Sequence, residues 1–340
     1  MTNNSKIKVS IIIPHLKGEK NLFECIQSIK SKVKFEIIIV DNDSAGESIN
    51  NTKAKFSQVQ IIKSNYNRGY AGGCNLGAKH AQGEYLFFLN DDTIVQKNTL
   101  DKLTKIMDDD ENISSVQPKI LNYYNKNKFD YAGACGGFID YLGYPFARGR
   151  IFDTIEIDSH QYDDVTKIFW ASGTAFMTRR TIFKKIGMFD EMLFAHMEEI
   201  DYHWKCSLND FDILVEPKAS IYHKGGQTLP YGSFKKIYLN HRNSLILFLS
   251  NNNMLSISSF MKRFFFEIVA FIYYAIKFNF KGSFAVILSL MYILSSVRYI
   301  MKRRKNILNK IEKVENQSIL KSSIIYQYYI KGKKIYQEID

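Results

Sequence analysis

Short apolar runs separated by amphipathic stretches organise the first third of the chain. The runs span residues 9–14, 35–40, 59–62 and 85–89. Continuous apolar runs of this length are typical of strands buried on both faces of a parallel sheet. Between the first two runs, Leu22, Cys25, Ile26 and Ile29 recur at helical spacing. This alternation of strand and helix predicts an α/β fold with an open, mostly parallel sheet and flanking helices.

Polar residues stand where the apolar runs end. Pro14 closes the first run, Asp41 follows the second, and Asn90, Asp91 and Asp92 follow the fourth. The carboxyl ends of parallel strands border the ligand crevice in open α/β sheets. Two adjacent carboxylates are too costly inside a strand without a cation or donors. We therefore expect this acidic tip, residues 90–92, to face water, a metal or a phosphate; N-capping of the next helix is the alternative role.

The turn after the first run argues against one kind of ligand. Residues 14–18 read Pro-His-Leu-Lys-Gly and lack the glycine fingerprint that dinucleotide-binding sheets carry at this point. The sheet is therefore predicted to bind a nucleotide but not a dinucleotide.

The last third of the chain has a different pattern. Residues 260–276 and 282–297 are apolar and aromatic, and the second segment is slightly shorter than the ~17–25 residues of a spanning helix. A basic run follows at 298–305. Ordinary buried helices are the alternative, but apolar residues nearly all round and a basic end favour contact with an anionic membrane surface. We predict a catalytic domain over 1–250 and a membrane-associating helical region with a basic tail over 251–340.

Composition and charge indicate the binding partners and the cellular compartment of the protein. The 340 residues carry a formal net charge of +12, and basic residues interleaved with aromatics point to lipid head groups or nucleic acid. The four cysteines form no CxxC pair, which is typical of reduced thiols in a cytosolic protein. The polar N-terminus lacks an apolar signal core, so we expect the catalytic part at the cytoplasmic face.

The ordered motifs resemble those of the inverting glycosyltransferases of family 2. The resemblance covers about residues 8–250. The motifs that carry it lie at residues 9–14, 40–44, 65–77, 89–93, 173–180, 187–190, 198–201, 223–226 and 242–243. Within the family, the chain looks most like the bacterial rhamnosyltransferase-type branch that builds cell-surface polysaccharide.

The resemblance implies a GT-A fold, a nucleotide-sugar donor and a divalent cation, Mg²⁺ or Mn²⁺. By motif position Asp41 contacts the base or ribose, Asp91 lies near the ribose and diphosphate, and Asp92 binds the metal. His223 either completes the metal shell or binds the diphosphate; a structural histidine is the alternative. Asn90 stands where many members carry Asp. The remaining donor-binding candidates are Pro14, Asn67, Gly69, Gly72 and Arg242, the last of which has loop capping as its alternative.

Attack by an acceptor hydroxyl requires a positioned base. The resemblance assigns this role to Glu199, with Glu198 and Asp201 as competing candidates. An exposed acidic helix start is the alternative for these residues. Trp170 and Gly173 are the acceptor-binding candidates, because sugars stack on aromatic faces; core packing of Trp170 is the alternative.

These observations predict inverting sugar transfer, rhamnose favoured, from a dTDP- or UDP-sugar to a lipid-linked saccharide. The transfer would take place at the cytoplasmic face of a bacterial membrane, to which the protein would attach as a peripheral or monotopic protein. Nucleic acid is not an expected partner. Two alternatives remain: a nucleotidyltransferase that makes an activated sugar, and a basic nucleic-acid-binding protein.

Overall fold

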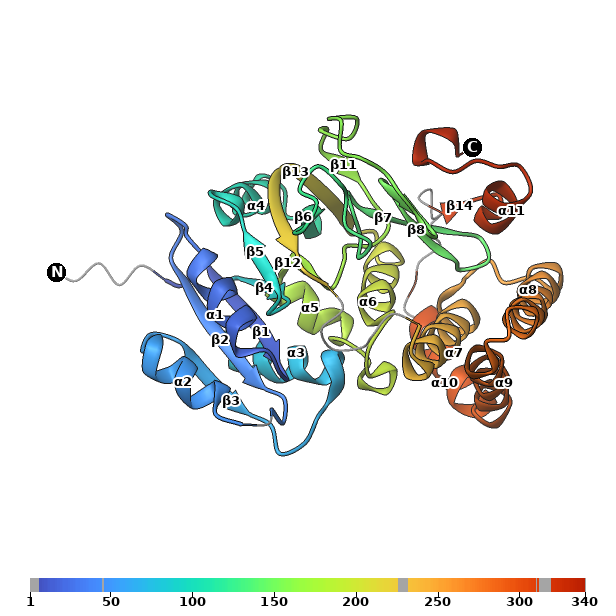
Figure 1. Ribbon diagram of the computed structural model, residues 1–340, viewed down its shortest axis with the longest axis horizontal. Helices are drawn as coiled ribbons and strands as arrows, with labels where there is room; N and C mark the ends of the chain where they lie inside the picture. The colour runs from blue at the N-terminus through green and yellow to red at the C-terminus, as the bar shows by residue number, and fades with distance from the viewer. Residues whose placement is uncertain (1–5, 45, 226–231, 310, 312–318, 340) are drawn as a thin grey trace.

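A computed structural model describes residues 6–44, 46–225, 232–309, 311 and 319–339. A mixed nine-stranded sheet forms its centre, with strands in the order β11-β13-β6-β12-β4-β1-β2-β3 and β5 paired to β13 (Figure 1). The strands are β1 (Val9–His15), β2 (Phe35–Asp41), β3 (Gln60–Lys63), β4 (Tyr85–Leu89), β5 (Thr93–Val95), β6 (Ile113–Asn122), β11 (Thr166–Lys167), β12 (Ala175–Arg179) and β13 (Asp212–His223). The four apolar runs of the first third form β1 to β4, which confirms the predicted α/β fold.

Strands β3, β2, β1 and β4 are parallel, and β12 joins β4 in the antiparallel direction. The register pairs His15 of β1 with Asp41 of β2, so both strands end at one edge of the sheet. His223, the first residue of the motif at 223–226, is the last residue of β13 and pairs with Thr93 of β5.

Helices cover both faces of the sheet because successive strand residues point to opposite sides. Ile11 and Ile13 share a buried cluster with residues of α1, α2 and α4, whereas Ile12 and Ile38 share another with α3, α5 and α6. The helices of this part are α1 (Glu19–Ser28), α2 (Ser48–Lys55), α3 (Gly69–His80), α4 (Thr99–Asp109), α5 (Arg180–Ile186) and α6 (Glu198–Ser207), with a 3-10 turn η1 (Glu191–Leu193) before α6.

The remaining elements lie at the other end of the molecule (Figure 1). A five-stranded sheet runs in the order β10-β9-β8-β7-β14. Its strands are β7 (Gly137–Asp140), β8 (Pro145–Ala147), β9 (Arg150–Ile151), β10 (Thr154–Ile155) and β14 (Ile319–Leu320). Beside it lie α7 (Phe234–Asn251), α8 (Ile257–Ile276), α9 (Phe280–Ser295), α10 (Val297–Leu308), α11 (Ile324–Tyr329) and the turn η2 (Tyr336–Glu338).

The region after residue 250 shares buried surface with the part before it. One apolar cluster contains Trp204 of α6, Leu247 of α7, Ile293 of α9 and Ile300 of α10. Strand β14 pairs in parallel with β7, which brings the C-terminal segment back onto the second sheet. The predicted boundary at residue 250 therefore falls at a place where the two sides are packed together.

Helix α3 lies very close to the sheet. A Cβ atom on Gly77 would lie 2.5 Å from Cγ2 of Ile12 and 3.1 Å from Cγ2 of Val40. Both strand residues are fully buried, so neither side chain has free space into which it can move. The glycine lets α3 hold its N-terminal end at the strand ends, where the predicted donor site lies.

We expect Gly77→Val to lower the free energy of unfolding by about 1–3 kcal/mol, because the added side chain overpacks the contact between α3 and the sheet. Urea unfolding measures the change. Lys79→Ala, at an exposed position of the same helix, is the control and should stay within about 0.5 kcal/mol of the wild type. An unchanged unfolding midpoint for the valine variant would contradict the close packing.

Candidate active site

Polar side chains hold the edge at which β1 and β2 end. Oδ1 of Asp41 accepts hydrogen bonds from the backbone N–H of Ser44 at 2.9 Å and from its hydroxyl at 2.6 Å. The buried Asn42 donates to the carbonyl of Gly69 at 2.9 Å and to Oδ1 of Asn67 at 3.3 Å. Oδ1 of Asn67 also accepts from the N–H of Gly69 at 2.8 Å. Three predicted donor-binding residues, Asp41, Asn67 and Gly69, are thus fixed next to one another.

Gly69 and Gly72, in the first turn of α3, lie close to neighbouring protein atoms. Gly69 has a φ of 69°, and a Cβ there would lie 2.2 Å from the carbonyl oxygen of Phe194. A Cβ on Gly72 would lie 2.6 Å from Cβ of Arg68. Close approach of chain to chain therefore accounts for both glycines, and their contact with a donor stays a prediction.

Asp91 is paired with a histidine that the motif comparison did not single out. Its Oδ2 lies 2.7 Å from Nδ1 of His15, and Nε2 of His15 lies 3.1 Å from the hydroxyl of Ser48. Burial raises the pKa of Asp91, and the contact with His15 lowers it. Burial has the larger effect, so the pKa of Asp91 lies above its ordinary value. His15 is completely buried and so fixes the position of this carboxylate at the strand end.

Asp92 belongs to a buried row of three side chains. Nε2 of His223 lies 3.2 Å from Oδ1 of Asp92, and Nδ1 donates to Oδ1 of Asp130 at 2.9 Å. Burial lowers the pKa of His223, but the two carboxylates raise it by more, to about 10. Burial also raises the pKa of Asp92, but His223 lowers it by more. The pKa of Asp92 therefore lies below its ordinary value. At neutral pH the row holds an imidazolium between two carboxylates.

This row fits a divalent cation. Oδ1 of Asp92 is buried and has no properly aligned hydrogen bond from the described residues, although Nε2 of His223 is near it. A carboxylate oxygen and an imidazole nitrogen that face each other are the arrangement a shared metal ion would take up, and Asp130 would orient the imidazole from behind. Within the part of the chain that the structure describes, no group of three or more His, Cys, Asp or Glu has a metal-binding arrangement. Two protein ligands leave room for diphosphate oxygens and water, as is usual for Mg²⁺.

Glu198 and Glu199 are the first two residues of α6. Burial raises the pKa of both carboxyl groups above the ordinary range, and the neighbouring Glu199 adds to the effect on Glu198. The backbone N–H groups of Gly173 and of Glu199 itself act in the other direction on Glu199. Glu198 is 4% exposed, whereas Glu199 is only half-buried. A carboxyl group with a raised pKa that substrate can reach is suited to take up a proton.

The connection before β12 joins the two sides of the site. The N–H of Asn90 in the acidic tip donates to the carbonyl of Thr174 at 3.0 Å. The preceding residue, Gly173, contacts Glu199 through its N–H and accepts a hydrogen bond from the hydroxyl of Tyr70 through its carbonyl. The acidic tip and Glu199 therefore lie on either side of one short stretch of backbone. The sequence placed Gly173 at the acceptor; the structure places it between the two candidate catalytic groups.

Asp201 does not fit the role of an alternative base. Its side chain is fully buried and contacts the guanidinium of Arg303, the amide of Asn251 at 2.7 Å and the ammonium group of Lys205 at 3.0 Å. Burial raises its pKa, but Arg303 and Lys205 outweigh burial and hold the pKa well below the ordinary value. A carboxylate held by cations in this way is a poor proton acceptor.

Trp170 takes the core-packing alternative. Its side chain is 4% exposed, and the indole N–H donates to the carbonyl of Phe138 at 2.8 Å. The ring lies directly against Gly137, where a Cβ would come within 2.0 Å of it. The ring faces of Trp170 are thus not available as a platform for a sugar, and we withdraw that assignment.

Arg242 takes the loop-capping alternative. Its guanidinium donates to the carbonyls of Met192 at 3.0 Å and Leu193 at 3.1 Å, both in η1. It also lies over the ring of Tyr238. These contacts bind the guanidinium to protein carbonyls, which leaves the diphosphate role without support.

Sequence reasoning missed His15, Asp130 and Tyr70. His15 directly follows the apolar run of β1, so the rule that strand ends border the site could have found it. Asp130 and Tyr70 carry no such signal, because long-range folding alone brings them to His223 and Gly173.

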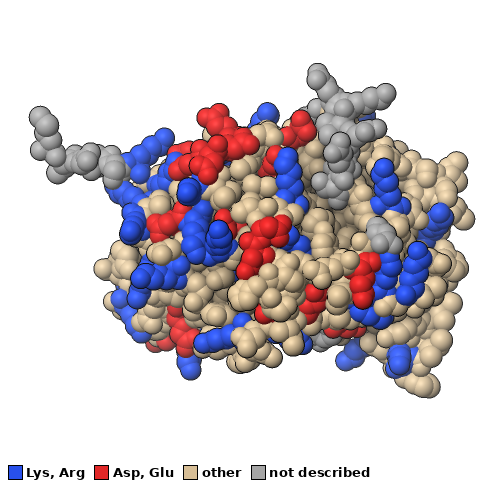
Figure 2. Space-filling model, turned by 90° about the horizontal axis from the view of Figure 1, so that it is seen from above, with Lys and Arg blue, Asp and Glu red and all other residues tan. Residues whose placement is uncertain are grey.

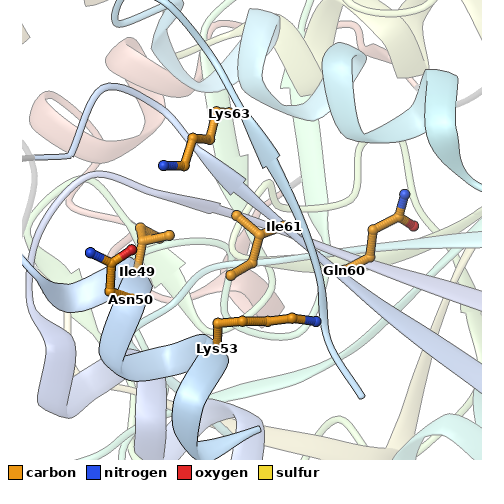
Figure 3. Close-up of a pocket in the computed structure, with 6 residues that line it drawn as sticks. All are labelled: Ile49, Asn50, Lys53, Gln60, Ile61 and Lys63. Carbon is orange, nitrogen blue, oxygen red and sulfur yellow. The ribbon is translucent and has the colours of Figure 1, made fainter. Parts of the chain in front are cut away.

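A cavity of about 490 Å³ lies beside this edge of the sheet, between α2 and β3 (Figure 3). It is lined by Ile49, Asn50, Lys53, Gln60, Ile61 and Lys63. Lys63 pairs with Asp41 in the register of β2 and β3. The cavity is thus one strand away from Asp41, and none of the predicted site residues lines it.

A profile of glycosyl transferase family 2 matches residues 10–187, which is more than half of the chain. The chain belongs to this family. The matched range contains the acidic tip, Asp41 and the 172–174 connection.

Individual relatives agree with this assignment. The low-salt glycan biosynthesis hexosyltransferase of Haloferax volcanii is 26% identical over 73% of this chain and 76% of its own. A dTDP-rhamnosyl transferase of Shigella flexneri is 24% identical over 75% of this chain and 84% of its own. The solved structure of GalNAc-T7 with UDP, GalNAc and Mn²⁺ superposes with a TM-score of 0.56 at 16% identity, over 72% of this chain and 48% of that one. This chain thus spans about half of that protein, and the likeness confirms the GT-A fold.

In EDTA, the stability that His223 contributes should fall as the pH rises. The pKa of His223 is about 10 in the folded protein and about 6.5 in an unfolded chain. A group whose pKa folding raises contributes fully below the unfolded pKa and loses its contribution as the pH approaches the folded one. The difference in unfolding free energy between wild type and His223→Gln should therefore shrink between pH 7 and pH 10.

Urea unfolding at a series of pH values measures this difference. His80→Gln, an exposed histidine of α3, is the matched control and should differ little from the wild type throughout. A difference for His223→Gln that stays constant up to pH 10 would show that the row of three side chains does not hold an imidazolium.

Proposed function

We propose that this family 2 glycosyltransferase transfers a sugar, with inversion, from a nucleoside diphosphate donor to a hydroxyl of a lipid-linked saccharide. The arrangement around residues 172–174 carries the proposal. It places a carboxyl group with a raised pKa, Glu199, on one side and the acidic tip on the other. Inverting transfer requires these two groups: a base for the acceptor and a polar surface for the leaving diphosphate.

On the donor side, Asp41 is the group for the nucleoside and Asp91, held by His15, is the group for the ribose and diphosphate. Asp92 and His223 would hold the divalent cation, Mg²⁺ or Mn²⁺, with Asp130 orienting the imidazole. When bound, such an ion would supply positive charge to neutralise the leaving nucleoside diphosphate. Metal binding would also require His223 to release its proton, since only a neutral imidazole is a ligand.

On the acceptor side, Glu199 removes the proton from the attacking hydroxyl. The new bond forms between the acceptor oxygen and the anomeric carbon while the bond from that carbon to the diphosphate breaks on the opposite face. The proton stays on Glu199, and the negative charge leaves with the nucleoside diphosphate. Burial raises the pKa of Glu199, which brings it nearer to that of a base able to work at neutral pH.

Rhamnose is the donor sugar that we favour. Two observations support this choice. The sequence motifs resemble those of the rhamnosyltransferase branch, and the dTDP-rhamnosyl transferase of Shigella flexneri aligns along most of both chains. A screen of dTDP-rhamnose, UDP-glucose, UDP-galactose, UDP-GlcNAc and GDP-mannose tests this choice directly, with release of the free nucleoside diphosphate as the readout.

Glu199→Gln should lower kcat for the donor that the screen selects by about 10²–10⁴-fold, because the amide cannot accept the proton. Glu198→Gln should lower it less, since the Glu198 side chain is more deeply buried.

Turnover with Mn²⁺, with Mg²⁺ and with EDTA measures the need for a cation in the same assay. Full activity of Glu199→Gln would reject this base, and release of pyrophosphate in place of the nucleoside diphosphate would favour nucleotidyl transfer.

We also propose that α8 and α9 attach the protein to an anionic membrane surface. Helix α8 has its polar and apolar sides reversed relative to a helix of a water-soluble core. Arg263 and Glu267 are each 1% exposed and pair with each other at 3.0 Å, and His241 of α7 lies 2.6 Å from Glu267. Apolar side chains cover the outer faces of the two helices; they include Met261, Phe265, Ile268, Ile272 and Ile276 of α8 and Phe280, Phe284, Met291 and Leu294 of α9. We call this set the apolar outer face.

The apolar outer face is large enough to mark an interaction surface. The end of the molecule that carries α8, α9 and α11 is mostly uncharged, with scattered basic side chains (Figure 2). Lys277, Lys281 and Arg298 lie exposed at the ends of the two helices. Basic residues beside an apolar face match a surface of anionic lipids.

The length of the helices favours a position in the plane of the membrane surface. Among the described residues, no single helix is long and apolar enough to cross a bilayer. Helices α9 and α10 reach that length only together, and the chain bends by 70° between them. We therefore propose that α8 and α9 lie in the interface at the cytoplasmic face, where a lipid-linked acceptor is found.

Phe265→Glu combined with Ile272→Glu should lower binding to vesicles of phosphatidylglycerol and phosphatidylethanolamine more than tenfold, because each replaced side chain would contribute about 1.5–3 kcal/mol when buried. Flotation of the full chain with the vesicles measures binding. Ile157→Glu combined with Val165→Glu makes the same chemical change at exposed positions away from the apolar outer face and should float like the wild type. Equal flotation of all three proteins would overturn the proposal.

A further inference from the structure

The segment that leads into α6 is strained. Phe194, His196 and Met197 have φ values of 65°, 66° and 73°, in the left-handed region that residues with a side chain rarely adopt. Glu198 and Glu199 follow immediately. Such a conformation persists only where surrounding contacts impose it. The position of the proposed base therefore depends on whatever holds residues 190–201, which we call the α6 entry segment.

Helix α7 holds the middle of the α6 entry segment. The fully buried amide of Asn243 donates to the carbonyls of Leu193 at 2.9 Å, Ala195 at 3.1 Å and His196 at 2.7 Å. Arg242 adds its two bonds to the carbonyls of η1. These contacts fix the backbone of the loop but reach neither of its ends.

Arg303 of α10 holds both ends. Its Nε donates to Oδ2 of Asp190 at 3.0 Å, and its terminal nitrogens donate to Oδ1 of Asp201 and to Oδ1 of Asn251, the latter at 2.6 Å. Asp190 caps η1 through the N–H of Met192 at 3.0 Å. One guanidinium, 8% exposed, thus joins the residue that begins the segment to the residue in the first turn of α6.

Apolar packing closes only part of this interface, where Ile200 of α6 and Ile300 of α10 share one buried cluster. A cavity of about 930 Å³ lies between α10 and the elements α5, η1 and α6, and Arg303 and Asp190 are part of its lining. Beside the cavity, two side chains of α10 make polar contacts with the α6 entry segment. The hydroxyl of Tyr299 donates to Oδ2 of Asp190 at 3.0 Å, and Arg303 contacts both Asp190 and Asp201. A buried guanidinium that satisfies two carboxylates gives a fixed direction as well as attachment.

We propose that Arg303 is a positioning residue for sugar transfer. It fixes the start of α6, and with it the carboxyl group of Glu199, relative to the acidic tip. The proposal rests on the proposed role of Glu199 as the base. Under this proposal α10 supports catalysis through Arg303. In the chain, α10 directly follows α9, which carries part of the apolar outer face.

The test compares Arg303→Met, Arg303→Lys and the double variant Asp201→Asn with Arg303→Met. The single methionine variant removes one of the two cations that contact the buried Asp201 and leaves Lys205 as the other, which lowers stability in its own right. The double variant removes both charges, so its unfolding temperature should return towards that of the wild type. Each variant is assayed for donor hydrolysis with the one of the five nucleotide sugars that the wild type hydrolyses fastest.

Loss of positioning should lower kcat at least tenfold in both the single methionine and the double variant, while the KM for the donor stays within about threefold. Displacement of a catalytic group by about 1 Å can cost about 10²-fold in rate. Arg303→Lys keeps one charge but cannot bridge both carboxylates and should fall in between. Lys302→Met, at the exposed neighbouring position of α10, is the matched control and should keep the wild-type kcat.

A merely structural role gives a different result: kcat of the double variant would recover together with its unfolding temperature, and the proposal would fail. It would also fail if Arg303→Met kept the wild-type kcat. Glu199→Gln, assayed in parallel, reports separately on the base. Full turnover of that variant would reject the base under the proposed function, whereas the kcat of the double variant decides whether Arg303 positions the segment.

Discussion

The structure of this glycosyltransferase depends on how the chain compensates its buried carboxylates. A carboxylate removed from water needs a cation, a hydrogen-bond donor or a proton. Asp92 receives His223, Asp91 receives His15, and Asp201 receives Arg303. Among the residues that the structure describes, Glu198 and Glu199 have no cationic partner, and burial raises their pKa values. The partner of each group decides its chemistry: cationic partners lower the pKa values of Asp92 and Asp201, whereas Glu199 is left able to take up a proton.

The same constraint separates two acidic clusters that look alike in the sequence. At the strand end, His15 and His223 stand behind the carboxylates and are themselves held by Ser48 and Asp130. An imidazole can give up its proton, which the proposed metal binding by Asp92 and His223 would require. At the start of α6, Asp201 meets a guanidinium, which keeps its charge at all physiological pH values. That carboxylate is therefore committed to structure.

Buried polar groups also explain why the C-terminal helices turn apolar side chains outwards. The inner side of α8 is occupied by Arg263 and Glu267, which pair with each other and with His241 of α7. On the inner side of α10, Arg303 forms ion pairs with Asp190 and Asp201. Ion pairs inside and apolar residues outside are the reverse of a water-soluble helix bundle. This reversal is consistent with the proposal that one face of these helices is covered by lipid, while their polar inner side holds the catalytic segment in place.

The sequence by itself determined the α/β architecture, the family and the acidic tip, because apolar periodicity and strand-end residues are local properties of the chain. It also marked Glu198, Glu199 and Asp201 as one acidic group, but it could not divide them. Arg303 lies 102 residues beyond Asp201, and only folding brings the two together. The sequence left two roles open for Trp170 and for Arg242 for the same reason: Gly137 and the carbonyls of η1, which contact them, come from distant parts of the chain. The tertiary structure alone decided which polar group faces which partner, since burial and pairing depend on long-range packing that no local pattern records.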